Sequence, residues 1–222
     1  MVNLVKLSNL LFKSLPFFHK TIWFNFKCFP IKTAFKFPVL FLSKSTVNIG
    51  GNCRINSDKI SFGMIKIGQD FKTNRPNSGV HINLKRGGIM EFNGTSSIGH
   101  NSCIEVGEKG LLNIGNNVIM SYGGVIYAYH YVRIGNNCRI GWDTVIMDTA
   151  FHALKLSDGR KTKGYAPVII GNNVWIPSFC KVMAGAVVPD FIIFGSGSYI
   201  SKDFSDIPPK SLLAGNPITI VR

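Results

Sequence analysis

The chain of 222 residues is poor in acidic side chains, with 11 Asp and Glu against 25 Lys and Arg and a formal net charge of +14. No acid precedes Asp58, whereas residues 1–45 contain seven lysines. This imbalance favours an anionic partner, such as a lipid surface or an acidic polymer. No recognised nucleic-acid-binding motif accompanies the charge, and we therefore expect no nucleic-acid partner.

Long apolar runs are also missing. A membrane-spanning helix needs about 18 or more consecutive apolar residues, but the apolar stretches near the N-terminus are interrupted by Lys6, Lys13, Lys20 and Lys27. The same lysines argue against a secretory signal peptide. We expect a cytoplasmic protein.

The five cysteines show no Cys-x-x-Cys unit and no Cys/His spacing of the kind that binds zinc. Three of them, Cys53, Cys138 and Cys180, each lie four positions after an isoleucine. These isoleucines belong to the repeat described next. We expect small, inward-facing thiols in a reducing compartment rather than a disulfide framework.

An aliphatic residue followed by glycine recurs along the chain with a six-residue beat. The copies are Ile49-Gly50, Ile67-Gly68, Ile98-Gly99, Ile114-Gly115, Ile134-Gly135, Ile140-Gly141 and Ile170-Gly171. Several of them continue with one or two asparagines. Such a beat is typical of a hexapeptide solenoid, in which three repeats of roughly six residues form one coil.

The repeat predicts a parallel β-coil with an aliphatic column inside it. Glycine and asparagine tolerate the positive φ that we expect at each corner, while the aliphatic residue points inward. Stacked coils bury a continuous column that no single repeat could bury alone. A β-sandwich is the alternative, but its period of two would not keep glycine in step with isoleucine.

Residues 1–45 differ from the rest in composition, because they also hold nine of the 17 phenylalanines and Trp23. Two compatible interpretations follow. The rings could plug the open end of the coil as a partly helical cap, or they could form a membrane-surface segment with the evenly spaced lysines. We expect residues 46–222 to form the coil, with a polar, basic loop at about 152–167 where the beat breaks. Such an excursion is a common place for chemistry.

Four segments carry a resemblance to a known family. They are Gly141-Trp142-Asp143-Thr144-Val145-Ile146-Met147-Asp148-Thr149-Ala150-Phe151-His152, Pro167-Val168-Ile169-Ile170-Gly171-Asn172-Asn173-Val174-Trp175-Ile176, Gly195-Ser196-Gly197-Ser198 and Ala214-Gly215-Asn216-Pro217. Together they resemble the hexapeptide-repeat O-acyltransferases. The chain is most similar to the branch that acetylates capsular, lipopolysaccharide and colanic-acid-type sugars, and more distantly similar to maltose and galactoside acetyltransferases.

This resemblance implies a left-handed parallel β-helix, assembled as a homotrimer, that uses acetyl-CoA as acyl donor. The residue matching the family's general base is His152, and imidazole suits that role because its ordinary pKa lies near neutrality. Asp148 is the candidate for orienting it, with Asp143 or a carbonyl group as alternatives. The chain departs from the family at Ala150, where a second acid is common.

The resemblance also implies positions for the two substrates. The residues matching the coenzyme A site are Trp175, Ala184, Gly185, Gly195, Ser196, Lys202, Asn216 and Arg222. The candidates for binding the acceptor are Trp142, Asp143 and His130. No metal is expected: γ-class carbonic anhydrases share the β-helix, but they need two neighbouring histidines in one coil, and His81, His100, His130 and His152 contain no such pair.

The sequence therefore predicts an acetyl-CoA-dependent O-acetyltransferase that acts on a sugar hydroxyl of a cell-surface polysaccharide or its precursor. The basic N-terminus would suit a lipid-linked glycan at the inner membrane, with the enzyme at the periphery of that membrane, or an acidic polysaccharide. Two alternatives remain open. One is a nucleotide-amino-sugar N-acetyltransferase, and the other is a β-helix scaffold without catalytic activity, which the residue at Ala150 would allow.

Overall fold

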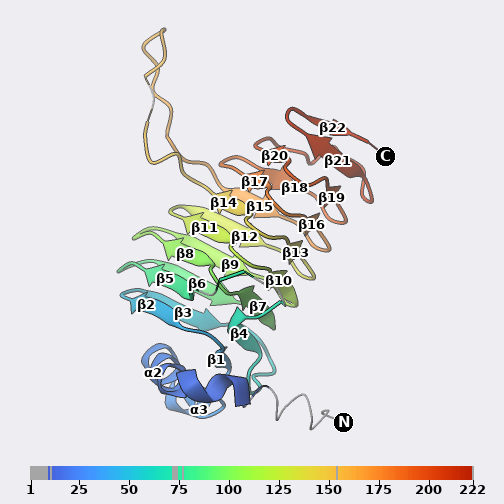
Figure 1. The fold of residues 1–222 in the computed structure, drawn as a ribbon. Helices are drawn as coiled ribbons and strands as arrows, with labels where there is room; N and C mark the ends of the chain where they lie inside the picture. The colour runs from blue at the N-terminus through green and yellow to red at the C-terminus, as the bar shows by residue number, and fades with distance from the viewer. Residues whose placement is uncertain (1–9, 11, 72–74, 77, 154, 222) are drawn as a thin grey trace.

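The six-residue beat folds into short parallel strands that pair with the third strand further along the chain, up to β19, which pairs with β21. This computed structural model describes residue 10 and residues 12–71, 75–76, 78–153 and 155–221. The strands stack into three sheets that form the faces of a coil (Figure 1). The predicted left-handed parallel β-helix is confirmed.

The three sheets run along the whole coil. The first sheet consists of β1 (Val39–Phe41), β4 (Ile65–Gln69), β7 (Ser96–Gly99), β10 (Val118–Met120), β13 (Arg139–Ile140), β16 (Trp175–Ile176), β19 (Ile193–Phe194), β21 (Leu212–Gly215) and β22 (Ile218–Ile220). The second consists of β2 (Ser45–Ile49), β5 (Val80–Leu84), β8 (Cys103–Val106), β11 (Val125–Ala128), β14 (Val145–Met147), β17 (Lys181–Val182) and β20 (Tyr199–Ile200). The third consists of β3 (Asn52–Ile55), β6 (Ile89–Phe92), β9 (Leu111–Ile114), β12 (Tyr131–Ile134), β15 (Val168–Ile170) and β18 (Val187–Val188).

The predicted aliphatic column is confirmed. Its members are buried throughout the regular part of the coil: Ile134, Ile140, Ile146, Ile170, Ile176, Val182 and Val188. The thiols of Cys53, Cys138 and Cys180 are buried beside the column, and all five cysteines are free. Each buried aliphatic side chain contributes about 1.5–3 kcal/mol, so stacked repeats stabilise one another.

Asparagine and glycine both supply positive φ at corners, as expected, and glycines such as Gly68, Gly123 and Gly185 have φ of 79°, 68° and 88°. Asn117, Asn137 and Asn173 have φ of 56°, 57° and 56°. The glycine before each pair of asparagines is needed for space instead. A Cβ on Gly135 would lie 2.3 Å from the carbonyl oxygen of Gly171 in the next coil.

The amide side chains of these corners form ladders between coils. The backbone N–H of Asn116 donates to Oδ1 of Asn136 at 2.7 Å, and that of Asn136 donates to Oδ1 of Asn172 at 2.8 Å. The N–H of Asn172 donates to Asp190 Oδ1 at 2.7 Å. The asparagines therefore satisfy backbone donors that a tight corner would otherwise expose.

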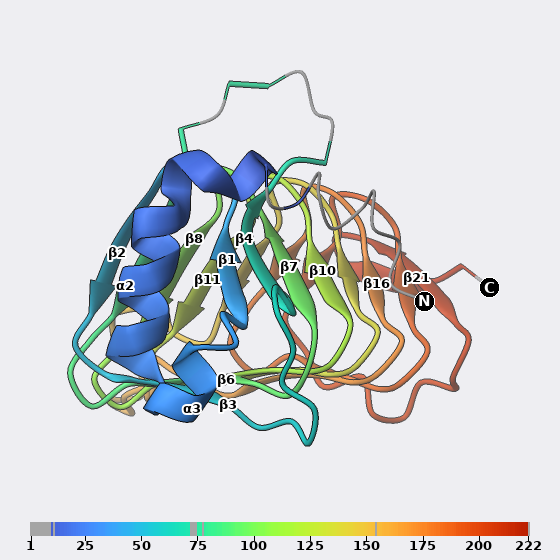
Figure 2. The same ribbon diagram turned by 90° about the horizontal axis from the view of Figure 1, so that it is seen from below.

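Three helical segments precede the coil: η1 (Leu15–Phe17), α2 (Phe18–Cys28) and α3 (Ile31–Ala34). Helix α2 lies across the first end of the coil (Figure 2). Its buried Asn25 donates to the carbonyl of Val39 at 2.8 Å, and Thr21 Oγ1 accepts the N–H of Phe41 at 3.0 Å. These bonds satisfy backbone groups of β1, the edge strand of the first sheet, which would otherwise be open to further pairing.

A long excursion separates β14 from β15. It leaves the coil as a two-stranded hairpin, with isolated antiparallel bridges from Thr149 to Tyr165 and from Lys155 to Lys161. Figure 1 shows this hairpin projecting from the coil near the end opposite to α2. None of the helices in the described residues combines the length and the apolar content that a membrane span requires.

Candidate active site

Three predicted site residues gather where the second sheet turns into the third. His130 lies in the turn after β11, and Asp148 and His152 lie in the excursion after β14, one coil further on. Because β11 pairs directly with β14, the two turns are stacked. We call this region the hairpin corner, made of residues 129–130 and 148–167.

Asp148 is fully buried, and its carboxylate accepts hydrogen bonds from the backbone of the turn beneath it. Oδ1 accepts the backbone N–H of Tyr129 at 2.8 Å, and Oδ2 accepts that of His130 at 2.7 Å. In this chain the carboxylate therefore holds the Tyr129–His130 turn. A direct pairing with His152 is not among the hydrogen bonds of the described residues, and the orientation of His152 by Asp148 stays a prediction.

His152 is exposed at the base of the hairpin. Its backbone is held closely, because a Cβ on Gly164 of the returning strand would lie 2.6 Å from the carbonyl oxygen of His152. The ring of His130 contacts that of Tyr165 with 4.9 Å between centroids. Both imidazoles therefore lie at the hairpin corner, where a solute from solvent can reach them.

Sequence reasoning missed a polar cluster at this corner, formed by Lys85, Glu105 and Tyr129. The Tyr129 hydroxyl donates to Glu105 Oε1, Lys85 Nζ donates to that hydroxyl at 2.9 Å, and Lys85 lies 3.1 Å from Glu105 Oε1. The three residues are far apart in sequence. The register of β5, β8 and β11, which the repeat specifies only loosely, brings them together.

The electrostatics of this cluster favour a charged carboxylate and a neutral phenol. Burial opposes the charge on Glu105, but hydrogen bonds from Tyr129 and Lys85 lower the pKa of the carboxyl group below its ordinary value. Burial and the bond to Glu105 raise the pKa of Tyr129. The hydrogen bond with Tyr129, together with Glu105, raises the pKa of Lys85. The cluster thus keeps a fixed cation at the surface.

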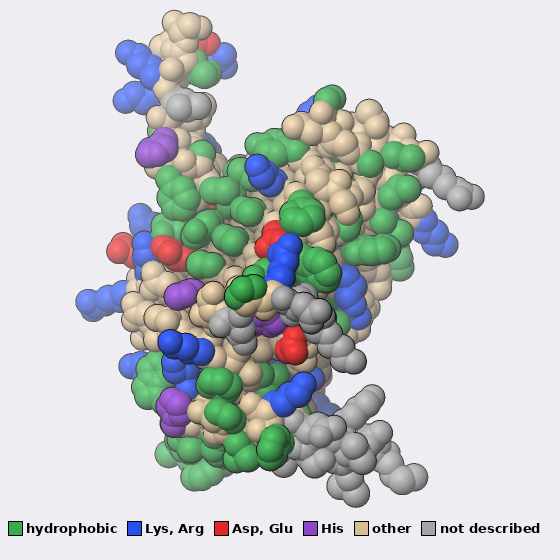
Figure 3. Space-filling model, in the orientation of Figure 1, with side chains coloured by type: hydrophobic (Ala, Val, Ile, Leu, Met, Phe, Trp, Pro, Cys, Tyr) green, Lys and Arg blue, Asp and Glu red, His purple; other side chains and the backbone are tan. Residues whose placement is uncertain are grey.

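A groove of about 340 Å³ opens beside the cluster, lined by Lys85, Glu108, Lys109 and Tyr129. The hairpin reaches it through Phe151, whose ring packs edge-on against that of Tyr129 at 5.0 Å. Figure 3 shows Lys and Arg side chains gathered toward the far end of the hairpin. Glu108 and the Lys85–Glu105 ion pair balance the lysines of the groove, so the positive charge that suits an anionic solute lies on the hairpin.

Trp142 and Asp143 lie at a different corner, where the first sheet turns into the second. Asp143 forms an ion pair with Arg75, and the guanidinium of Arg75 lies 4.9 Å from the ring centroid of Tyr122 and 5.7 Å from that of Trp142. The hydrogen bond to Asp143 raises the pKa of Arg75. Within one chain, these two residues are therefore separated from His152.

The residues predicted for the acyl donor are spread over the last coils. Lys202 and Asn216 line one groove of about 200 Å³, together with Tyr199, Ser201, Phe204, Pro217 and Ile218. Ala184 and Gly185 turn between the second and third sheets, Trp175 is exposed on the first sheet, and Gly195 and Ser196 follow β19. Arg222 lies outside the described residues.

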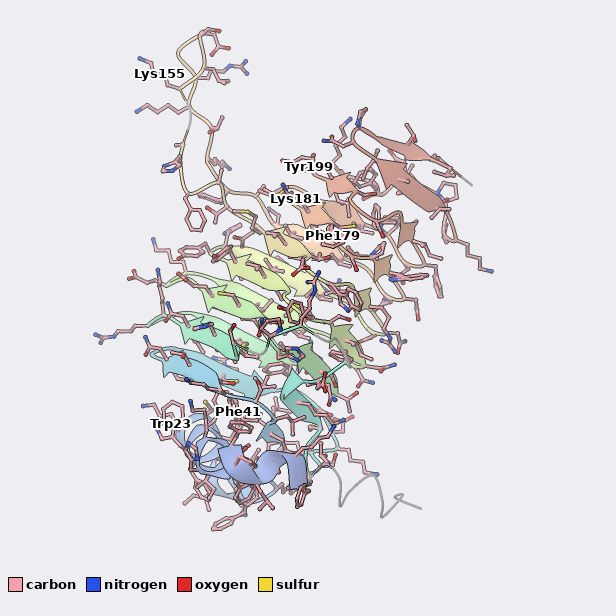
Figure 4. The ribbon with its side chains drawn as sticks, in the orientation of Figure 1. Trp23, Phe41, Lys155, Phe179, Lys181 and Tyr199 are labelled. Carbon is pink, nitrogen blue, oxygen red and sulfur yellow. The ribbon has the colours of Figure 1, made fainter. Side chains whose placement is uncertain are left out.

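The face of the last coils carries exposed rings beside a cation. Phe179, Lys181 and Tyr199 lie near one another there (Figure 4), and Lys181 and Tyr199 are register partners in the second sheet. Among the described residues, no three His, Cys, Asp or Glu side chains come close enough to hold a metal ion.

Comparison with known proteins agrees with this architecture. The chain is 31% identical over 112 residues to the galactoside O-acetyltransferase of Escherichia coli (strain K12), a match that covers 50% of this chain and 53% of the relative. No protein-family profile matches the chain. The resemblance to the hexapeptide-repeat acetyltransferases is confirmed. The chain spans about half the length of this curated relative.

Two solved structures share the fold of this hexapeptide-repeat protein. The polySia-specific acetyltransferase NeuO matches with a TM-score of 0.62 and 18% identity, over 80% of this chain and 76% of NeuO. The polysialic acid O-acetyltransferase OatWY matches with a TM-score of 0.50 and 22% identity, over 80% of this chain and 84% of OatWY. At identities of 18% and 22%, the similarity to these two structures establishes a shared fold and nothing about activity.

Proposed function

We propose that this protein transfers the acetyl group of acetyl-CoA to a sugar hydroxyl of a cell-surface polysaccharide or its precursor. The observation that carries the proposal is the position of His152, an exposed imidazole where a basic hairpin leaves a rigid coil beside a polar groove. The galactoside O-acetyltransferase relative supports the same class of reaction.

His152 is the general base of this proposal. Its imidazole takes the proton from the acceptor hydroxyl as the oxygen attacks the thioester carbonyl, and the new ester C–O bond forms as the C–S bond breaks. The proton then passes from the imidazolium to the departing thiolate. Asp148 has a positioning role in this proposal. Its carboxylate fixes the Tyr129–His130 turn, against which the hairpin packs.

The last coils fit the acyl donor. In the groove of about 200 Å³, Lys202 supplies a cation for phosphate, Asn216 an amide, and Tyr199 a ring against which a flat base can stack. Trp175 and Ser196, two other predicted donor residues, lie in and beside the first sheet, whereas Tyr199 and Lys202 lie in and after β20 of the second. We propose that the donor lies between neighbouring subunits of a homotrimer, where such faces meet.

The acceptor of this proposal is an acidic glycan. Lys85 and Lys109 line the groove at the hairpin corner, and Lys155, Lys161 and Lys163 are exposed on the hairpin. Glu108 and Glu105 offset the two groove lysines, whereas on the hairpin the one acid is Asp158, which is already paired with Arg160. The names of NeuO and OatWY, which refer to polysialic acid, point to the same chemistry.

The N-terminal residues 1–45 act in this proposal as a cap and membrane-surface segment, and residues 46–222 as the acyltransferase domain. The enzyme would work in the cytoplasm, at the inner face of the membrane where lipid-linked glycans are extended. Trp142, Asp143 and His130 are the proposed acceptor-binding residues. Since Trp142 and Asp143 lie at another corner than His152, they would act on the acceptor bound to a neighbouring subunit.

The test is free-thiol release from acetyl-CoA with a panel of acidic oligosaccharides, neutral oligosaccharides and amino sugars. We expect acceptor-dependent release by the wild type and a loss of at least 100-fold in His152→Ala. His81→Gln, an exposed histidine on β5, is the matched control and should keep full activity. Release only with amino sugars would establish N-acetylation instead, and absence of coenzyme A binding would establish a scaffold.

A further inference from the structure

Helix α2 exposes large apolar side chains on the face turned away from the coil. Phe24 is buried against the coil together with Thr21 and Asn25. The opposite face carries Ile22, Trp23 and Phe26, all exposed. A helix on the surface of a globular protein normally presents polar residues to solvent, and one that is apolar all round is normally covered on every side.

Further apolar side chains extend this exposed face at the same end of the coil. Ile31 of α3 is 69% exposed, Phe35 is 66% exposed, and the rings of Phe26 and Phe35 pack edge-on at 5.1 Å. Figure 4 shows Trp23 at this end, below the buried Phe41 of β1. We call Ile22, Trp23, Phe26, Ile31 and Phe35 the cap face.

The charges that residues 1–45 contribute to the cap face are all positive. Lys13, Lys27, Lys32 and Lys36 are exposed, whereas residues 1–45 contain no Asp or Glu. Lysine stems can cover apolar surface while the ammonium groups stay in water. Rings flanked by cations are the composition of segments that bind the interfacial region of a bilayer.

We propose that the cap face docks on an anionic lipid surface, with its rings among the headgroups and its lysines against the phosphates. Each lysine near such a surface contributes about 1 kcal/mol, and tryptophan favours the interfacial region. A second copy of the chain is a poorer occupant. Pairing two cap faces would bring two sets of lysines together with no acid from residues 1–45 to offset them.

This docking sets the distance of the site from the membrane. Helix α2 lies across the end of the coil (Figure 2), so the coil stands on the lipid surface with the hairpin corner away from it. Four strand spacings separate β2 from β14 in the second sheet, which is roughly 20 Å at about 4.8 Å each. The helical layer adds roughly 10 Å.

This distance also limits which sugar of the acceptor can reach the hairpin corner. That limit rests on the proposed function. An acceptor sugar at the hairpin corner would lie roughly 30 Å from the headgroups, by the same strand and helix dimensions. The enzyme would therefore modify a sugar that is several units removed from its lipid carrier. The sugar attached directly to the lipid would be out of reach.

The test is co-sedimentation of the full chain with vesicles of phosphatidylcholine alone or mixed with phosphatidylglycerol, without acceptor or acetyl-CoA. We expect at least tenfold tighter binding to the mixed vesicles, weakened by high salt. The variant Lys27→Gln/Lys32→Gln/Lys36→Gln should lose more than tenfold in affinity, and Trp23→Ser/Ile31→Ser/Phe35→Ser should lose binding to both kinds of vesicle. Arg133→Gln/Lys181→Gln/Lys210→Gln removes as many charges from exposed positions on later coils and should bind as the wild type does.

Two results would overturn the docking. One is a vesicle assay in which the wild type binds neither kind of vesicle, or in which both cap-face variants bind as well as the wild type. The other is a dimer in solution that the apolar variant abolishes, which would make a second copy the occupant. Circular dichroism checks that the variants fold, and thiol release with a soluble acceptor should remain normal in them. A failed vesicle assay would thus leave the transferase proposal intact.

Discussion

Lys155 lies directly opposite Lys161 across the two strands of the hairpin. Like charges in register on paired strands are destabilising, and both side chains are exposed. The neighbouring cation Arg160 is already paired with Asp158 at 2.7 Å. A bound polyanion would offset this repulsion, which agrees with an acidic acceptor.

The first prediction concerns this lysine pair. In Lys155→Gln and Lys161→Gln, the KM for an acidic oligosaccharide should rise roughly fivefold, since an exposed charge interaction contributes up to about 1 kcal/mol. The kcat should change little, and the KM should depend less on salt. Steady-state kinetics at two ionic strengths measures this. A neutral acceptor is the control, and an equal rise in its KM would contradict an electrostatic role.

The second prediction concerns Asp148. Replacement by Ala removes the acceptor of two backbone N–H groups, of Tyr129 and His130. Each buried donor left without a partner costs about 1–3 kcal/mol, so the free energy of unfolding should fall by roughly 2–5 kcal/mol in a urea titration. Asp148→Asn keeps one acceptor oxygen and should lose about half as much. Equal stability of the two variants would show that the turn does not depend on the carboxylate.

The third prediction separates the structural and binding roles of Asp143. Its ion pair with the exposed Arg75 should contribute less than about 1 kcal/mol to stability. If Asp143 contacts the acceptor, Asp143→Asn raises the acceptor KM severalfold while Arg75→Gln changes it less. Parallel changes in both variants would mean that only the ion pair matters.

The fourth prediction concerns the close stacking of the coils. Gly135→Ala should destabilise the protein by about 1–3 kcal/mol, because its Cβ would meet the backbone of Gly171 at 2.3 Å. Gly159→Ala, in the hairpin, is the control. There, no atom lies within 4 Å of the new Cβ, and only the positive φ of 85° opposes the side chain. Thermal unfolding compares the two, and a larger loss at Gly159 would refute the stacking argument.

The fifth prediction is a loss of stability in alkali. Burial raises the pKa of Cys138 to about 11, above its ordinary value near 9. The folded state therefore binds the thiol proton more tightly than the unfolded state does, and stability falls as pH rises from about 9 to 11. The loss from this thiol is roughly 3 kcal/mol, because two pKa units correspond to about 1.4 kcal/mol each. Cys138→Ala should flatten that part of the profile, and an unchanged slope would contradict the assignment.

The repeat predicted the column and the corner conformations correctly but gave no sign of the close contact between coils at Gly135. Ile134, Ile140 and Ile146 are buried as their spacing indicates, because each coil repeats the same inward direction. The contact between Gly135 and Gly171 could not be foreseen, since it depends on how far apart two coils settle. Positive φ occurs at both residue types, as at Asn137 and at Gly68, Gly123 and Gly185.

The candidate site was less readable than the fold. The motif around residues 141–152 is continuous in sequence, yet β14 runs through its middle and places its two ends at different corners of the coil. Trp142 and Asp143 therefore join Arg75, while Asp148 and His152 lie at the hairpin corner beside His130. The cluster of Lys85, Glu105 and Tyr129 was missed because its members lie on three separate coils.

By itself, the sequence determined the β-helix, its inward column and the place where the hairpin leaves it. These features follow from a local period that every repeat obeys independently. Tertiary structure alone decided which corner each polar residue occupies, that Asp148 holds the turn below it, and that α2 exposes a second apolar face. Those features depend on the stacking register and on the packing of the cap, which involve residues far apart in the chain.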